Sequence, residues 1–202
     1  MLAQVVSAAL QGVDSYLVSV EVNLGKGIPS FSVVGLAEGA VREGRERVWA
    51  AIQNSGFAIP PKKITVNLAP ADIRKEGSAF DLPLAIGLLS GAREVPVTKL
   101  EGRAFVGELG LDGSLRPVRG ALAMAEACRR AGMTSLILPT GNAPEAGVVR
   151  GIEVMGAATL VDVVNHLAGR APLPAAPPDR CVLGRGEETT GGDLAEVRGQ
   201  TH

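Results

Sequence analysis

Segments with strand-like and helix-like patterns follow one another in this chain without regular alternation, and this order most limits its possible fold. Residues 15–22 alternate apolar and polar side chains, and together with residues 3–10 they predict a hairpin that turns at Gly12. Residues 37–55 instead carry apolar side chains at helical spacing and end at Gly56. Because strands and helices are mixed but do not alternate, we predict a single α+β domain.

The remaining elements follow from the same patterns. A second hairpin is predicted from residues 103–107 and 115–118, because Asp112-Gly113 between them is typical of a type I′ turn. After Gly169 the sequence becomes rich in Pro and Ala, which predicts a domain over residues 1–168 and a flexible linker over residues 169–192. The other predicted strands are residues 31–34, 64–68, 135–138 and 153–155, and the other helices are residues 78–89, 120–130, a short one near Ala143, and 160–168.

Composition limits the classes of function. The formal net charge is -1, which gives no global field for a polyanion, and only 3% of residues are aromatic, so a platform that stacks nucleic-acid bases is not expected. Cys128 and Cys181 fall in a predicted helix and in the linker, which favours reduced thiols. The apolar start has no basic region, and no stretch reaches roughly 18 apolar residues. We therefore expect a cytoplasmic protein without a membrane partner.

Three long segments carry a resemblance to a known family: GLAEGAVREGRERVWAAIQNSGF, ITVNLAPADIRKEGSAFDLPLAIGLL and FVGELGLDGSLRPVRGAL. Their order and spacing resemble the amino-terminal domain of the ComM/YifB family of Mg-chelatase-like AAA+ ATPases, over residues 1 to about 168. Residues 193–200 resemble the segment that opens the AAA+ module in these proteins. The resemblance implies a ribosomal S5 domain 2-like fold, which the peptidase domain of Lon proteases shares.

The resemblance also implies a role for a longer protein. Members of the ComM type are ring-forming ATPases linked to DNA branch migration during natural transformation. This chain has no G-x-x-x-x-G-K-[ST] motif, and so no phosphate-binding loop of that kind. We therefore expect ATP and Mg²⁺ to bind in an ATPase module that begins at residues 193–202, and we expect no cofactor or metal site within this chain.

The likeness to Lon raises the question of a Ser-Lys dyad, in which a partly desolvated lysine activates a serine. Aligning the Lon-type pattern with residues 75–79 places Ala79 at the nucleophile, and the pattern at residues 115–121 places Leu122 at the lysine. Both positions are apolar, so we expect no catalysis by this chain. A shift of one residue leaves Ser78, with Lys75 nearby, as the remaining catalytic candidates.

Two polar residues near this motif have simpler interpretations. Ser78 is expected to cap the helix that follows it, by accepting an N–H bond from the first turn. Asp81 is expected to interact with the positive end of that helix. The alternative for Asp81 is a polar contact to a neighbouring subunit or to the ATPase module.

Most basic residues are interleaved with acids, as on an ordinary solvated surface. Arg116 and Arg119 are less compensated, since the nearest acid in sequence is Asp112. With Arg74 and Lys75 they flank the region that matches the Lon cleft, which makes these four residues the candidates for DNA contact.

The leading hypothesis is therefore an assembly domain that positions or regulates an AAA+ DNA-remodelling ring. Its expected partners are its own AAA+ module and neighbouring subunits of the ring, with DNA as a further candidate. The first alternative is a module that binds DNA directly, and the second is a serine peptidase with residual activity.

Overall fold

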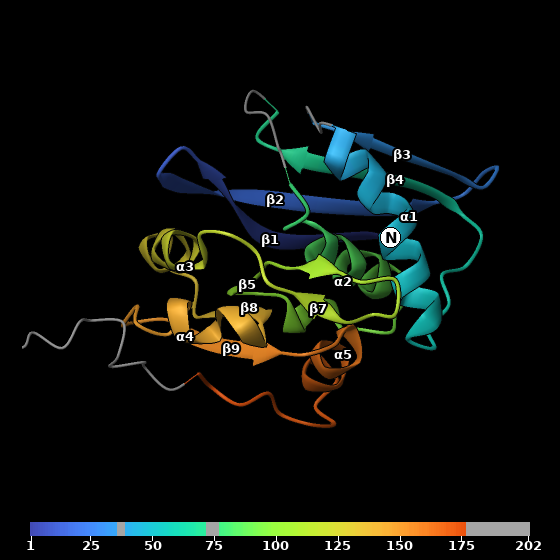
Figure 1. Cartoon of the computed structure of the whole chain (residues 1–202). Coiled ribbons are helices and arrows are strands. Elements are labelled where there is room, and N and C mark those ends of the chain that lie inside the picture. Colours follow the sequence, from blue (N-terminus) through green and yellow to red (C-terminus); the bar gives the residue numbers. More distant parts are fainter. Residues whose placement is uncertain (36–38, 72–76, 177–202) are drawn as a thin grey trace, which may run out of the picture.

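A seven-stranded mixed sheet runs through the computed structural model, which describes residues 1–35, 39–71 and 77–176 (Figure 1). Its strand order is β3-β4-β2-β1-β5-β8-β9. The strands are β1 (Leu2–Gln11), β2 (Asp14–Gly25), β3 (Ser30–Val34), β4 (Lys63–Ala69), β5 (Arg103–Phe105), β8 (Ser135–Pro139) and β9 (Glu153–Ala157). The helices are α1 (Gly39–Asn54), α2 (Asp81–Gly91), α3 (Ala121–Arg130), α4 (Ala143–Ala146) and α5 (Leu160–Leu167), with short 3-10 turns at Val97–Lys99 and Thr140–Asn142.

Parallel and antiparallel pairs coexist in the sheet. The β1–β2 hairpin is antiparallel, with Val6 opposite Ser19, and β2 pairs antiparallel with β4. β3 joins β4 in parallel, and β1, β5, β8 and β9 form a parallel series. The predicted α+β class is confirmed, and so are the first hairpin, the strands at β3, β4, β8 and β9, and the helices at α1, α3, α4 and α5.

Alternation along β1 sends apolar side chains into two separate cores. Val5 belongs to the larger core with α1, α2 and α5, whereas Ala8 belongs to the smaller core with α3 and α4. All residues of α2 are buried, and an ideal Cβ on Gly87 would lie 2.6 Å from the Val22 side chain. Glycine at this position therefore lets α2 lie directly on β2.

The second hairpin differs from the prediction. Residues 103–105 form β5 inside the main sheet, and the small hairpin pairs β6 (Glu108–Leu109) with β7 (Leu115–Arg116). The Gly113 amide bonds to the Gly110 carbonyl, and Gly113 has a φ of 82°. Asp112 is not among the residues with positive φ, so the turn is not type I′, which needs positive φ at both central positions. The pattern matches a three-residue loop that closes on a left-handed glycine.

The helix predicted from Ser78 begins three residues later, at Asp81. Its N-cap is Phe80, which supplies no side-chain hydrogen bond to the helix end. The helix begins later because the Ser78 hydroxyl donates to Glu108 and does not cap the helix end. Only the Ser78 backbone carbonyl accepts a bond, from the Asp81 amide.

The chain continues past residue 168 along the edge of the sheet. The Ala176 amide donates to the Val154 carbonyl, and Ala175 forms a bridge with Met155 of β9. Residues 177–202, which include the rest of the predicted linker and the expected start of an AAA+ module, lie outside the described residues. Within the described part of the chain, no helix is long and apolar enough to span a membrane.

Candidate functional site

A surface cleft of about 610 Å³ lies where the Lon-like pattern places the catalytic centre. We call it the Ser78 cleft. The tip of the β1–β2 hairpin, the segment before α2 and the segment before α3 form its walls. Its lining residues are Ala9, Leu10, Gly12, Gly77, Ser78, Ala79, Glu108, Pro117, Val118, Arg119 and Met124.

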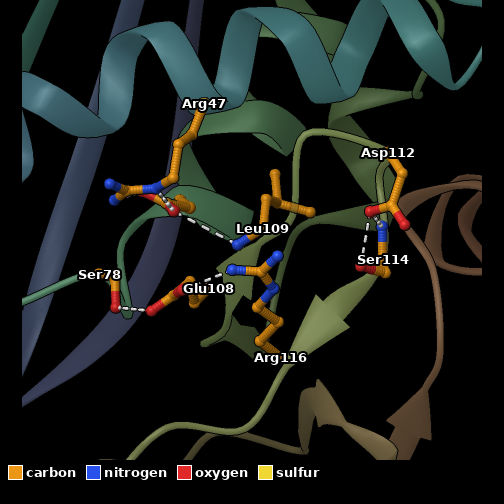
Figure 2. Close-up of polar contacts among 8 residues, drawn as sticks. Arg47, Ser78, Glu108, Leu109, Asp112, Ser114 and Arg116 are labelled. Atoms are coloured by element: carbon orange, nitrogen blue, oxygen red, sulfur yellow. Dashed lines mark hydrogen bonds and ion pairs between the residues drawn. The ribbon is translucent and has the colours of Figure 1, made fainter.

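A chain of polar contacts crosses one wall of the Ser78 cleft (Figure 2). The Ser78 hydroxyl donates to Glu108 Oε2, and Glu108 Oε1 lies 3.6 Å from Arg116 Nη1. The expectation that Ser78 caps α2 is therefore wrong. Glu108 also partly compensates Arg116, although the Arg116 side chain keeps 59% of its surface exposed.

The two positions that the sequence pattern aligns with the Lon dyad are Ala79 and Leu122, whose side chains carry no reactive group. Ala79 lines the Ser78 cleft, and its carbonyl accepts a bond from the Gly107 amide. Leu122 lies at the start of α3 and is 43% exposed. Arg74 and Lys75 lie outside the described residues, so the structure brings together only Ser78, Arg116 and Arg119 of the candidates.

Arg119 differs from Arg116 in its surroundings. It is exposed on the rim of the Ser78 cleft, and no ion pair to it occurs among the described residues. Asn142 holds the segment that carries Arg119. Its side chain accepts a hydrogen bond from the Val118 amide and donates one to the Val118 carbonyl, both at 2.8 Å. Asn142 is buried, so this double contact holds the cleft wall in place.

Asp81 lies in the first turn of α2, as expected, and it also makes contacts that the sequence does not suggest. Its carboxylate accepts two bonds from Arg47 of α1, at 2.9 and 3.1 Å, and a third from the Leu109 amide at 3.3 Å. Desolvation raises the pKa of the Asp81 carboxyl, and the Arg47 guanidinium opposes this shift. The Asp81 side chain is only 4% exposed, and its contacts among the described residues are to Arg47 and Leu109. A contact to a neighbouring subunit or to the ATPase module stays a prediction.

Sequence reasoning missed Glu108 and Asn142. Glu108 lies 30 positions from Ser78, and Asn142 lies 24 positions from Val118. No periodicity or motif links positions so distant, and only the pairing of β6 with β7 and the packing of the loop before α4 bring them together.

The strand arrangement and the Ser78 cleft define the class of this protein, which is a Lon-like α+β domain of the ribosomal S5 domain 2 type. Lon protease 2 of Bacillus subtilis is similar to it, with 23% identity over 160 residues that cover 78% of this chain and 27% of that protein. The expected fold class is therefore confirmed.

Closer relatives identify the family. The family model described as "Subunit ChlI of Mg-chelatase" matches residues 20–142. The competence protein ComM of Haemophilus influenzae is 42% identical over 204 residues, covering 100% of this chain and 40% of that protein. The protein YifB of Escherichia coli is 40% identical over 192 residues, covering 95% of this chain and 37% of that protein. The chain belongs to this Mg-chelatase-like family of AAA+ ATPases and spans about 40% of the length of these two relatives.

Proposed function

We propose that this chain is a non-catalytic accessory domain that positions or regulates the ATPase ring of a Mg-chelatase-like protein of the ComM type. The observation that supports this proposal is the set of side chains that line the Ser78 cleft. The sequence pattern assigns Ala79 and Leu122 to the positions of the Lon dyad, and the Ser78 hydroxyl donates a hydrogen bond to the Glu108 carboxylate. A fold that keeps such a cleft without its reactive groups is suited to binding and not to hydrolysis.

The ATPase chemistry then belongs to a separate module. ATP and Mg²⁺ would bind there, because the 202 residues contain no phosphate-binding loop of the G-x-x-x-x-G-K-[ST] type. The resemblance to the ComM type implies DNA as the substrate of the whole assembly and branch migration as its activity, and the similarity to a competence protein agrees with this proposal. Neighbouring subunits of the ring and the ATPase module itself are the proposed partners, in the cytoplasm.

Adding the chain in trans tests this role. The part of the Haemophilus competence protein that lies outside the match is purified, and its ATPase rate and sedimentation are measured with increasing amounts of this chain. We expect a saturable change in rate and co-sedimentation. A Ser78→Ala variant is expected to act equally, because the proposal gives Ser78 no chemistry. Absence of both effects contradicts the proposal, whereas peptide cleavage that Ser78→Ala abolishes supports a peptidase.

A second candidate function is direct DNA binding through the Ser78 cleft, which the exposed Arg119 and Arg116 favour. Fluorescence anisotropy with single-stranded and forked DNA across a salt series tests it, because phosphate contacts weaken as salt rises. If DNA binds through the Ser78 cleft, Arg116→Ala with Arg119→Ala should weaken the binding and lower its salt dependence. The matched control is Arg129→Ala with Arg130→Ala, which removes the same charge from α3, where both arginines pair with Glu126.

A further inference from the structure

A second groove, of about 320 Å³, lies at the β3 edge of the sheet and shares no residue with the Ser78 cleft. We call it the Trp49 groove. The connection into β3, the outer side of α1 and the segment before β4 form it, and in Figure 1 these segments meet at the right-hand side of the sheet. Its lining residues are Pro29, Ser30, Phe31, Arg45, Glu46, Trp49, Pro60, Pro61, Lys62 and Ile64.

Aromatic side chains are concentrated in this groove. The chain has only four Phe, one Trp and one Tyr, yet Phe31 and Trp49 line it together. Both are partly buried and pack against the larger core, which fixes their rings. The Arg45 guanidinium lies over the Phe31 ring, 5.2 Å from its centroid, and the Arg45 side chain keeps 49% of its surface exposed. The groove therefore has an aromatic surface and the plane of the Arg45 guanidinium. Nucleic-acid bases stack on surfaces of both kinds.

The charges around the groove are mostly positive. Arg45 and Lys62 line it, and the exposed Lys63 follows directly at the start of β4. Glu46 is the single acid among the lining residues, and it pairs with Arg45 at 3.5 Å. No ion pair to Lys62 or Lys63 occurs in the described ranges. Two lysines beside the stacking surfaces therefore remain able to contact phosphates.

We infer that the Trp49 groove binds single-stranded nucleic acid, with a base stacked against Trp49 or the Arg45 guanidinium and the flanking phosphates held by Lys62 and Lys63. Paired bases in a duplex do not present their faces, so the groove selects single strands. The low aromatic content of the chain predicts no surface on which bases stack. Composition gives only the number of aromatic rings and does not show that two of them line one groove.

A proline-rich peptide is the other ligand that an aromatic-lined groove accepts. The excess of lysine and arginine favours the polyanion, since a proline-rich helix offers no negative charge for Lys62 and Lys63. The segment at residues 171–176 of this chain, which is rich in Pro, is already bound along β9 at the far edge of the sheet.

Trp49 is the only tryptophan, so its fluorescence reports directly on this groove. The chain is titrated with dodecathymidylate, and with an abasic deoxyribose-phosphate oligomer of the same length. We expect the thymidylate to quench Trp49 and the abasic oligomer to bind more weakly without quenching. No quenching by thymidylate, or equal quenching by both oligomers, overturns the inference. A spectral change with the peptide APLPAAPP but not with thymidylate overturns it in favour of peptide binding.

Charge variants separate this groove from the Ser78 cleft. Arg45→Gln with Lys62→Gln changes two exposed side chains, so the fold, checked by circular dichroism, is expected to persist. We expect at least about fivefold weaker binding of thymidylate, with a salt slope reduced by roughly 0.7 for the one phosphate contact that Lys62 loses. Quenching is expected to survive in the Arg116→Ala, Arg119→Ala variant. A change in anisotropy without quenching of Trp49, which is lost in the Arg116→Ala, Arg119→Ala variant, would refute nucleic-acid binding by the Trp49 groove. The same result would support DNA binding by the Ser78 cleft.

Discussion

The Arg47 guanidinium holds both carboxylate oxygens of Asp81 across the interface of α1 and α2, at 2.9 and 3.1 Å. Figure 2 shows Arg47 beside Leu109, whose amide donates to the same carboxylate. The close approach depends on Gly44, since an ideal Cβ there would lie 2.6 Å from Asp81 Oδ1. This pair therefore links the helix that carries the Trp49 groove to the helix that follows the Ser78 cleft.

Removing the carboxylate of this pair is expected to destabilise the fold. Asp81→Ala takes away the acceptor of the buried Leu109 amide and the counter-charge of Arg47, and we expect the free energy of unfolding to fall by about 3 kcal/mol. Asp81→Asn keeps one acceptor oxygen and should cost less. Urea denaturation followed by circular dichroism measures both. An Asp81→Ala variant as stable as the parent would show that the pair contributes nothing.

Gly35 lies where β3 ends, with a φ of 95°, and an ideal Cβ there would lie 2.2 Å from the Leu68 carbonyl oxygen. Gly56 also has positive φ, at 82°, but its Cβ would meet nothing within 4 Å. Gly56→Ala should therefore cost only the backbone strain, about 1 to 2 kcal/mol. Gly35→Ala should cost clearly more, because β3 must also move away from β4. Thermal unfolding of the two variants tests the difference, and equal losses would exclude a steric role for Leu68.

His166 connects α5 to the segment that runs along β9. Its Nδ1 accepts from the Leu173 amide at 3.0 Å, and its Nε2 lies 3.1 Å from Arg103 Nη1. Desolvation, together with the charges of Arg103 and Lys99, lowers the pKa of His166 below its ordinary 6.5, and Glu153 opposes the shift.

A lowered pKa makes the stability depend on pH in a definite direction. Below about pH 6.5 the unfolded chain binds a proton at this histidine more readily than the folded chain, so the stabilisation present above that pH is lost as the pH falls. We expect a lower urea midpoint at pH 5.5 than at pH 7.5, and a smaller difference in His166→Gln, whose amide oxygen can still accept from Leu173. An identical pH dependence in the variant would assign the effect to other groups.

Cys128 is expected to be chemically inert in the folded protein. It is buried on α3, and desolvation raises the pKa of its thiol to about 12. At pH 8 the thiolate fraction is then on the order of one in ten thousand. In a Cys181→Ser variant, Ellman's reagent should release no colour until the chain is unfolded in guanidinium. Rapid reaction under native conditions would contradict the burial of this thiol.

The sequence predicts the elements of this fold better than it predicts their partners. Val5 and Ala8 each follow the alternation of a strand, and the helical spacing around Val48 is equally clear, so local periodicity is sufficient there. The second hairpin differs from the prediction because residues 103–105 form only a short strand, and its pairing with β1 and β8 is decided by the sheet.

The same limit applies to the candidate site. The position of Ser78 and Arg119 at one cleft could be predicted, because the resemblance to Lon orders the surrounding segments. The partner of the Ser78 hydroxyl could not, since capping is a local rule and Glu108 is a distant residue. The partner of such a hydroxyl depends on the positions of the possible acceptors in the folded chain. Spacing along the sequence does not give these positions.

The strand order places the Trp49 groove at the β3 edge and the exit of the chain, after Ala176, at the β9 edge. Six intervals between neighbouring strands, at about 4.8 Å each, separate these edges by roughly 30 Å. A strand of nucleic acid bound in the groove would therefore lie at the opposite edge of the sheet from Ala176. The width of the sheet then sets the distance between the bound strand and Ala176.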